Sequence, residues 1–276
     1  MKKWIAVLLV AVLALACLTG CGKTEEDNTL KVGMECTYAP YNWTQSDDSN
    51  GAVPIQGTSS YANGYDVMWA KLMAESMGKE LVIVKTDWDS LVSGVMSGAL
   101  DMAIAGQSIT AERLQQVDFT TPYYYATIAT LVKKDSPYAS ATCVEDLAGA
   151  TCTSQIGTIW YNTCLPQIPN ANILQAQETA SAMLTALDSG AIEVVVTDRP
   201  TATAALMAYP DFVMLEFGGG EKDFQVSEEE INIGISVKKG NTELLDAANK
   251  VLSEYTEEDF TRMMNEAIAN QPLSQE

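Results

Sequence analysis

The sequence contains no histidine, the side chain that most often serves as a general base in enzymes and as a ligand in metal sites. Basic residues are also scarce, because 16 Lys and Arg stand against 36 Asp and Glu, and the formal net charge is −20. A chain this acidic has no basic stripe to neutralise phosphates. The composition therefore argues against nucleic acid as a partner and disfavours an enzyme that works through histidine.

Long apolar runs are rare, and the clearest one, Trp4–Leu18, follows Lys2 and Lys3 at the N-terminus. It is too short to span a bilayer comfortably, but it has the size of a signal-peptide core. It ends in Leu18-Thr19-Gly20-Cys21, which resembles the bacterial lipobox and implies cleavage before Cys21 and a lipid on its thiol. An uncleaved anchor helix is the alternative. Cleavage would change the net charge from −20 to −22, because residues 1–20 hold two lysines and no acids.

Cysteines are few after this point: Cys36, Cys143, Cys152 and Cys164. An exported protein can pair such residues, and Cys152 and Cys164 are the closest couple in sequence. Their spacing does not match a zinc site, and we expect no metal and no cofactor. Small buried thiols are the preferred interpretation.

The segment Ala103–Phe119 contains the strongest indication of a ligand site in the sequence. A short apolar run, Met102 to Ala105, is typical of a strand that is buried on both faces. The chain breaks at Gly106, and Thr110 is a good N-cap for the helix that follows. Arg113 then lies in the first helical turn, where the helix dipole disfavours a cation and where a bound anion would reverse that penalty. The alternative is a solvated Arg113 that pairs with Asp118 or another surface acid.

Short apolar strands alternate with helical periods along the whole chain, which predicts an α/β architecture with mostly parallel sheets. Strands are expected near 30–34, 81–85, 101–105, 128–133, 150–154, 172–175, 194–197, 213–216 and 233–237, with helices between them and two at the end, 242–254 and 257–269. The polar segments Thr44–Asn63 and Gly218–Glu230 are predicted to be loops.

One internal repeat suggests two lobes of similar construction. Met96–Asp101 and Asp188–Glu193 both end a helix at Ser-Gly and both lead into a buried strand. Aligning the two copies places Gly106 opposite Asp198, each at the carboxyl end of its strand, where open α/β sheets bind ligands. The alternative is that this is simply a good helix-to-strand turn that arose twice.

A cleft with Arg113 on one side and Asp198 on the other would suit a zwitterion. The α-carboxylate of an amino acid would pair with the guanidinium, and its ammonium would lie against the carboxylate. Asp198 has a second interpretation as a helix cap before Pro200.

Several motifs occur in an order that resembles one family, the bacterial extracellular solute-binding proteins of family 3, which are the polar amino-acid-binding proteins of ABC importers. The resemblance covers about residues 30 to 270. Its motifs are Tyr38-Ala39-Pro40-Tyr41, Gly64-Tyr65-Asp66-Val67, Asp87-Trp88-Asp89-Ser90-Leu91, Ala105–Arg113, Val117–Tyr124, Gly157-Thr158 and Thr197-Asp198.

The resemblance implies a role for each site residue. Arg113 grips the ligand carboxylate together with backbone N–H groups at Ser108 and at Thr158 or Ile159. Asp198, the Gly106 carbonyl and the Ser108 hydroxyl hold the ammonium, and Gln107 lies in the same loop. Tyr38 and Trp88 enclose the ligand side chain, unless they are ordinary packing residues. Glu35 occupies a position where some relatives keep an acid that meets a cationic side chain.

Two departures from the family pattern concern the ligand. Gln107 stands where methionine is common, and Ile159 stands where a second threonine or a glycine is usual. Glu35, the acidic cleft mouth and the aromatic pair favour a cationic or polar amino acid, with arginine, lysine or histidine ahead of glutamine or cystine.

The resemblance also implies a two-lobed periplasmic-binding-protein type II fold. Lobe 1 is expected at 30–124 and 232–276, lobe 2 at 125–231, and the hinge at the two crossings between them. The implied protein is an exported monomer, anchored through Cys21 to the outer face of the cell membrane, that delivers its ligand to an ABC permease driven by a cytoplasmic ATPase. A dehydratase-like enzyme on the same fold and a receptor module for a sensor kinase are the alternatives.

Overall fold

A computed structural model describes residues 28–272 of the chain, so the expected signal peptide and Cys21 lie outside the described residues. The fold contains two five-stranded sheets and one smaller sheet. The first large sheet has the order β6-β1-β7-β14-β8, formed by β1 (Thr29–Met34), β6 (Glu80–Lys85), β7 (Met102–Ala103), β8 (Val117–Phe119) and β14 (Ser236–Lys238). This sheet draws on both ends of the described chain.

The second large sheet repeats the plan of the first. Its order is β11-β10-β12-β9-β13, formed by β9 (Ile128–Lys133), β10 (Thr151–Thr153), β11 (Asn172–Ile173), β12 (Val194–Asp198) and β13 (Phe212–Leu215). In both sheets the fourth strand, β14 or β9, runs antiparallel to its two neighbours, and the other pairs are parallel. The two-lobed α/β architecture is confirmed, and each large sheet is mixed, with two parallel and two antiparallel pairs.

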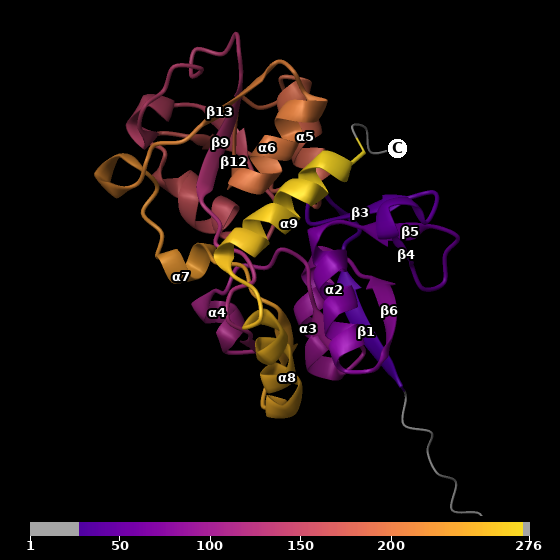
Figure 1. Ribbon diagram of the computed structural model, residues 1–276. Helices are drawn as coiled ribbons and strands as arrows, with labels where there is room; N and C mark the ends of the chain where they lie inside the picture. The colour runs from indigo at the N-terminus through magenta and orange to yellow at the C-terminus, as the bar shows by residue number, and fades with distance from the viewer. Residues whose placement is uncertain (1–27, 273–276) are drawn as a thin grey trace, which may run out of the picture.

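Helices pack on each sheet and give the two lobes seen in Figure 1. The helices are α2 (Tyr65–Ser76), α3 (Leu91–Ser97), α4 (Ala111–Leu114), α5 (Ala180–Asp188), α6 (Arg199–Ala208), α7 (Glu228–Ile231), α8 (Thr242–Leu252) and α9 (Glu257–Asn270). Helices α2 and α3 contact strands of the first sheet, and α5 and α6 contact strands of the second. The last helix, α9, contacts both α2 and α6 and so lies across the two lobes (Figure 1).

The internal repeat has the same structural role in both lobes. Gly98 and Gly190 follow α3 and α5 in a left-handed conformation, with φ of 80° and 75°, which glycine adopts without strain. The acid that ends each copy then bonds to the backbone of a neighbouring strand. Asp101 accepts a hydrogen bond from the Lys31 amide in β1, and Glu193 accepts one from the Thr151 amide in β10. The repeat therefore marks two lobes of like construction.

The expectation of a surface loop at Thr44–Asn63 was wrong in part. The region contributes to a four-stranded sheet of order β2-β3-β5-β4, formed by β2 (Thr37–Tyr38), β3 (Asn42–Gln45), β4 (Val53–Pro54) and β5 (Tyr61–Asn63). Its strands are two to four residues long, and the Gln45 amide holds the turn by donating to the backbone carbonyls of Asp47 and Ser49. Such short polar strands have too little apolar alternation to be recognised in a sequence.

The predicted loop at Gly218–Glu230 also needs correction, because α7 begins inside it. The other predicted elements are present with boundaries that differ by a few residues. In the described part of the chain, no helix is long and apolar enough to cross a membrane.

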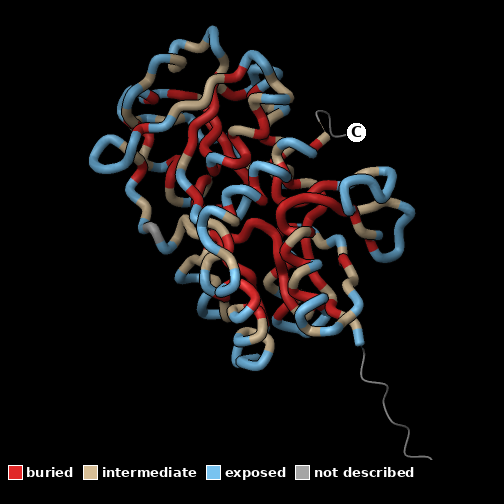
Figure 2. Tube along the Cα trace, viewed as in Figure 1, coloured by how far each residue is buried: buried red, intermediate tan, exposed pale blue. Residues whose placement is uncertain are grey.

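The core follows the sheets, and buried residues line the centre of each lobe in Figure 2. Below the junction of the lobes the core is aromatic: the Trp69 ring meets Tyr65, Tyr123 and Phe260 with centroids 5.4 to 6.3 Å apart. Aromatic pairs at these distances stabilise beyond their buried area. Phe260 belongs to α9, so this cluster ties the last helix to the first lobe.

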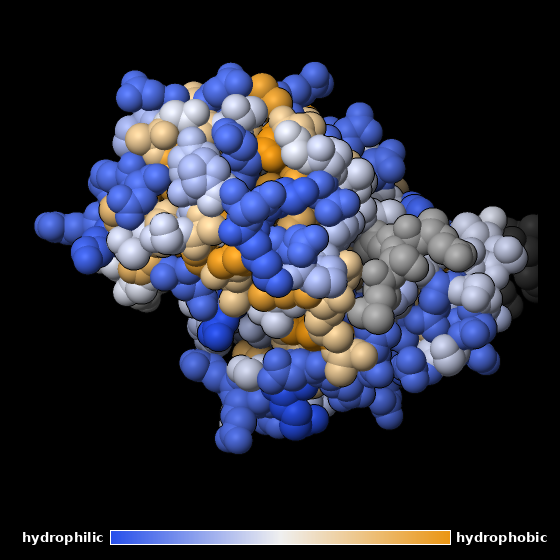
Figure 3. All heavy atoms as spheres, turned by 90° about the horizontal axis from the view of Figure 1, so that it is seen from above, coloured by the Kyte–Doolittle hydropathy of each residue, from blue (hydrophilic) through white to orange (hydrophobic). Residues whose placement is uncertain are grey.

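Hydrophilic residues cover most of the face drawn in Figure 3, with smaller hydrophobic areas between them.

The four cysteines of the described residues are free thiols, of which three are buried, Cys36, Cys152 and Cys164, and one is half-buried, Cys143. The pairing of Cys152 with Cys164 is therefore not formed.

Candidate ligand-binding site

The segment after β7 builds the cationic part of the site. Thr110 caps α4 as predicted, because its hydroxyl accepts a hydrogen bond from the Arg113 amide. The Arg113 guanidinium donates to the Ser108 carbonyl at 2.8 Å and to the Gly157 carbonyl, in the other lobe, at 3.0 Å. Asp118, the alternative partner, instead forms an ion pair with Lys239 at 3.6 Å. Arg113 thus lies where the lobes meet.

A pocket of about 410 Å³ opens beside this guanidinium. Five of the predicted site residues are among those that line it: Trp88, Gln107, Arg113, Thr158 and Ile159. The guanidinium carbon lies 5.1 Å from the Trp88 ring centroid, a distance at which a cation is attracted to the ring face. Burial lowers the pKa of Arg113 to about 10, so the group stays cationic at neutral pH. An anion in the pocket would therefore meet the positive charge of Arg113 and its remaining N–H donors.

The loop of Gly106, Gln107 and Ser108 is fixed from two directions. Gly106 has φ of 62°, and a Cβ placed there would lie 2.8 Å from Tyr38 Cε1, so both the conformation and the close approach require glycine. The Gln107 side-chain oxygen accepts from the Ser236 hydroxyl at 3.0 Å, and its backbone carbonyl accepts from Gly234. Although Gln107 lines the pocket, its side-chain oxygen is held by β14.

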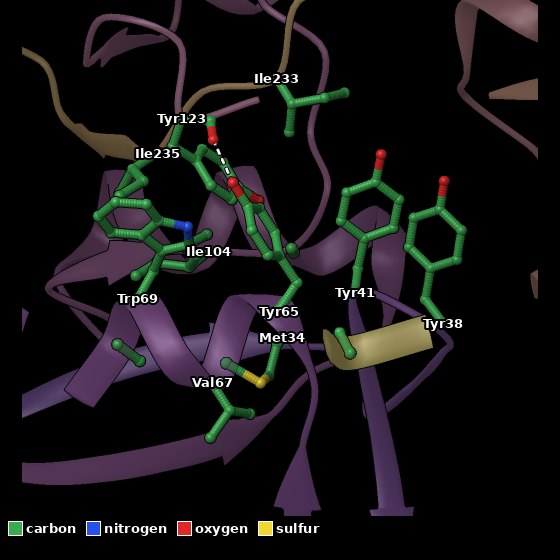
Figure 4. Packing of buried hydrophobic residues seen from close by; sticks show 14 of the residues in the cluster. Met34, Tyr38, Tyr41, Tyr65, Val67, Trp69, Ile104, Tyr123, Ile233 and Ile235 are labelled. Atoms are coloured by element: carbon green, nitrogen blue, oxygen red, sulfur yellow. Dashed lines mark hydrogen bonds between the residues drawn. The ribbon is translucent and has the colours of Figure 1, made fainter. Parts of the chain in front are cut away.

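Asp198 lies at the end of β12 and has the second of the two roles considered for it, that of a helix cap. It caps α6 by accepting hydrogen bonds from the Thr201 amide and hydroxyl, both at 2.9 Å. It also accepts from the hydroxyls of Tyr38 at 2.7 Å and Tyr41 at 3.2 Å, which come from the other lobe. Figure 4 shows these two rings side by side with their hydroxyls pointing the same way. The carboxylate is fully buried, and burial raises its pKa.

Glu35 forms a second contact between the lobes. It follows β1, is 4% exposed, and accepts hydrogen bonds from the Gln155 amide nitrogen at 3.1 and 3.3 Å. The pKa of Glu35 is raised to about 7, mainly by burial and in part by the negative charges of Asp66, Asp89 and Asp87, while the hydrogen bond from Gln155 opposes the shift. The charged groups that act on Glu35 are all acids, so the environment favours a positive charge beside it.

A third buried acid, Asp66, is linked to the Gly106 turn through hydrogen bonds. It accepts from the Tyr123 hydroxyl at 2.5 Å and from the Asn42 side-chain amide at 2.7 Å, and the Tyr123 hydroxyl in turn accepts from the Gly106 amide. Burial raises the pKa of Asp66 to about 7. Through Tyr123, Asp66 fixes the backbone of the Gly106 turn.

The structure thus divides the predicted residues into two groups. One group lines the pocket: Trp88, Gln107, Arg113, Thr158 and Ile159. The other group lies buried between the lobes: Glu35, Tyr38 and Asp198. The loop residues Gly106 and Ser108 contact members of both groups. Tyr41, Asp66, Tyr123 and Gln155 take part without having been predicted as site residues. Of these, Tyr41, Asp66 and Tyr123 stand inside the family motifs, but nothing local distinguishes Gln155.

The pocket presents a cation to a small molecule, and two buried acids lie near the junction of the lobes. A guanidinium faces the pocket, and the acids Glu35 and Asp198 are bonded to neutral donors. Within residues 28–272, no cluster of three or more potential metal ligands occurs.

A family model described as "Bacterial extracellular solute-binding proteins, family 3" matches residues 30–268. A probable histidine-binding protein of Campylobacter jejuni is 33% identical over 233 residues, which cover 80% of this chain and 84% of that protein. The L-cystine-binding protein TcyJ of Escherichia coli is 28% identical over 264 residues, covering 95% of this chain and 91% of that protein.

A solved structure gives the same picture of the fold. The amino acid ABC transporter substrate-binding protein AbpA of Streptococcus pneumoniae, bound to L-arginine, has a TM-score of 0.73 and 25% identity. The match covers 90% of this chain and 97% of that one.

Proposed function

The chain belongs to the bacterial extracellular solute-binding proteins, family 3, and on that basis we propose that it captures a free amino acid outside the cytoplasm for an ABC importer. The observation that carries this proposal is the position of Arg113. Its guanidinium lies at the junction of the lobes, beside a pocket of about 410 Å³. A pocket of this size suits a small molecule.

The ligand's two charges have matching partners. We place the α-carboxylate at Arg113, where the guanidinium fork and nearby backbone N–H groups converge. The ammonium goes to Asp198, with the Gly106 carbonyl and the Ser108 hydroxyl, and displaces the Tyr38 hydroxyl that now bonds this acid at 2.7 Å. The ammonium carries a full positive charge, so it is attracted to the carboxylate more strongly than the neutral phenol is, which favours that exchange.

We propose a basic amino acid as the ligand: arginine, lysine or histidine. Glu35 supports this choice, because it is buried among other acids and its present partner is a neutral amide. A cationic side chain would compensate the buried charge, which a neutral side chain cannot do. The relative named for histidine and the neighbour bound to L-arginine fit this class, whereas the relative named for L-cystine binds an amino acid whose side chain carries charges of both signs.

Capture requires both lobes, because the contacts proposed for the ligand are divided between them. We assign lobe 1 to 30–124 and 232–276 and lobe 2 to 125–231, with the hinge at the two crossings. The crossings are hydrogen-bonded to each other, since the Ile233 amide donates to the Tyr124 carbonyl at 3.0 Å. Paired strands of this kind can bend together, so ligand binding would shift an equilibrium between open and closed lobes.

The cellular setting is part of the proposal. We infer that the chain is exported, that a lipid on Cys21 anchors it to the outer face of the cell membrane, and that it acts as a monomer. The closed receptor would then dock on an ABC permease with a cytoplasmic ATPase. Metabolic labelling with a palmitate analogue tests the anchor, because a Cys21→Ala chain should lose both the label and membrane retention.

A thermal-shift screen of the soluble chain against the common amino acids and cystine tests the ligand class. Ligand at about a hundred times its dissociation constant should stabilise the folded state by about 2.7 kcal/mol. We expect arginine, lysine or histidine to produce the largest shifts. An equal shift for glutamine would overturn the preference for a cation, and no shift from any amino acid would overturn the proposed function.

An acid with a pKa near 7, such as Glu35, also has the property of a general acid or base, so the fold could host an enzyme. We propose binding without chemistry, because the relatives are named as binding proteins. Incubation with each stabilising ligand followed by mass spectrometry separates the cases, since a binding protein returns its ligand unchanged.

A further inference from the structure

Gln155 lies in a place that neither the sequence motifs nor the proposed ligand contacts explain. It follows β10 in the second lobe, is 3% exposed, and its amide nitrogen reaches across to both oxygens of Glu35, at 3.1 and 3.3 Å. Glu35 is the acid proposed to receive the ligand's side-chain cation. Gln155 therefore occupies the same acceptor that the ligand would use.

We propose that Gln155 is a specificity-determining residue whose amide stands in for the ligand side chain on Glu35 when the bound amino acid is too short to reach that acid. This inference rests on the proposed function. A long cationic ligand displaces the amide, whereas a short ligand leaves it in place. The residue would then widen the range of amino acids that the closed lobes accept.

The physical reason is the cost of a buried, unpaired carboxylate. Such a group loses its water when the lobes close, and a missing partner is far more costly than a weak one. The Gln155 amide supplies a neutral donor to Glu35, so closure on a short ligand leaves no orphaned charge. A guanidinium or ammonium group adds the attraction of opposite charges to its hydrogen bond with Glu35, so it displaces the neutral amide.

The contacts of Gln155 allow its side chain to move without its backbone. The Gln155 carbonyl is held by the Thr158 hydroxyl at 2.7 Å, and a β-bridge joins Gln155 to Gln177. The amide nitrogen has a second acceptor, the Glu178 carbonyl at 3.2 Å, which lies in its own lobe. When a ligand cation takes over Glu35, the amide thus keeps one hydrogen bond.

The expected effect on specificity has the same sign whatever the ligand-free state. If the free protein is open, removing the Gln155 amide weakens short ligands only, because they alone depend on it in the complex. If the free protein is closed, removal strengthens long ligands only, because they alone have to displace it. Both routes raise the ratio of the dissociation constant for a short ligand to that for a long one.

The test is a set of binding titrations with arginine and lysine as long ligands and alanine and serine as short ones. We expect Gln155→Met to raise the ratio of short-ligand to long-ligand dissociation constants by about tenfold, the size expected for one hydrogen bond to a charged group. Gln155→Asn, which retracts the amide, should act in the same direction and serves if the methionine variant folds poorly. Gln167→Met is the matched control, since that amide bonds the carbonyls of Thr163 and Gln225 within lobe 2.

A double-mutant cycle separates this role from a merely structural one. In the Glu35→Gln background there is no buried charge to satisfy, so Gln155→Met should change the ratio by less than about threefold. An unchanged ratio in both Gln155 variants, or an equal change in the Glu35→Gln background, would overturn the inference. So would binding of the long ligands alone by the wild type. Failure of every amino acid to bind would instead overturn the proposed function.

Discussion

At the scale of single residues, the site depends on three buried acids that have neutral partners. Glu35 is bonded to an amide, Asp66 to a phenol and an amide, and Asp198 to two phenols and a helix N-terminus. The described ion pairs lie elsewhere: Arg199–Glu216, Lys239–Asp118 and Arg262–Asp259. Buried carboxylates without cations are costly unless something compensates them, which is why a basic ligand suits this site.

Glu35 makes the binding of a basic ligand depend on pH. Its pKa is raised from 4.5 to about 7, so the acid carries a proton below about pH 7 and has to lose it before it can pair with a cation. With this pKa the ionised fraction of Glu35 falls from about one half at pH 7 to about one tenth at pH 6, so the dissociation constant for arginine should rise by up to about fivefold. Titration calorimetry in matched buffers measures this change.

Two controls separate Glu35 from the other acids. Alanine does not reach Glu35, and Glu35→Gln removes the titration, so both should show a weaker pH dependence than arginine shows with the wild type. Asp66 also has a pKa of about 7, but it lies below the site and acts on both ligands alike. Equal slopes for arginine and alanine would contradict the assignment of Glu35.

Asp66 should contribute mainly to stability. Asp66→Ala leaves the Tyr123 hydroxyl and the Asn42 amide as buried donors without their acceptor, and we expect the free energy of unfolding to fall by about 2–4 kcal/mol. Urea denaturation measures this loss. Asp259→Ala is the control, because Asp259 also accepts hydrogen bonds, from the Thr256 amide and hydroxyl and from the Arg262 guanidinium, but on the surface. Similar losses in both variants would show that burial is not the cause.

At the scale of elements, local signals were predictable and long-range pairings were not. Residue type and the helical spacing of apolar residues predict three of the local features: Thr110 as a cap, the Ser-Gly ends of α3 and α5, and the helices α8 and α9. The small sheet around β3 was missed because its strands are short and polar. Gln155 was missed for another reason: its partner, Glu35, is 120 residues away, and nothing next to Gln155 in the chain indicates that pairing.

The turn between β7 and α4 offers a test of how backbone and packing combine. Gly106 and Gly98 both have positive φ, 62° and 80°, but a Cβ on Gly106 would meet Tyr38 whereas a Cβ on Gly98 meets nothing within 4 Å. Gly98→Ala should therefore cost only the left-handed conformation, about 1–2 kcal/mol of stability.

Gly106→Ala carries the same backbone cost and also moves Tyr38, which bonds Asp198. We expect this variant to lose at least tenfold in arginine affinity, measured by calorimetry, while Gly98→Ala keeps its affinity. A loss of affinity that is the same in both variants would mean that the close approach of Tyr38 to Gly106 is unimportant.

At the scale of the whole molecule, the two sheets share one plan in which the strands β9 and β14 run antiparallel to both of their neighbours. The crossings are bonded to each other and to the binding loop, since the Gly234 amide donates to the Gln107 carbonyl at 3.0 Å. Helix α9 adds a further link, because the Gln271 side chain donates to the Ala204 carbonyl at 3.1 Å. Hydrogen bonds thus join the two crossings to the loop that holds Gln107, and a separate one joins the end of α9 to α6.

Closure around a ligand should be visible in the size of the molecule. We expect saturating arginine to lower the radius of gyration of the wild type in small-angle scattering, because the ligand contacts proposed here are complete only when the lobes are shut. Arg113→Ala should keep its ligand-free radius at the same arginine concentration. An identical radius for the wild type with and without a bound ligand would contradict capture by hinge closure.

The most direct measurement is a calorimetric titration of arginine, lysine and histidine into the soluble wild type and into Arg113→Ala, with Arg262→Ala as the control. Arg262 is an exposed arginine on α9 that pairs with Asp259 at 2.9 Å. We expect one site per chain in the wild type and in Arg262→Ala, and at least a hundredfold weaker binding in Arg113→Ala, since two hydrogen bonds to a charged group are lost. Equal binding by all three proteins would contradict the assignment of Arg113 as the residue that holds the ligand.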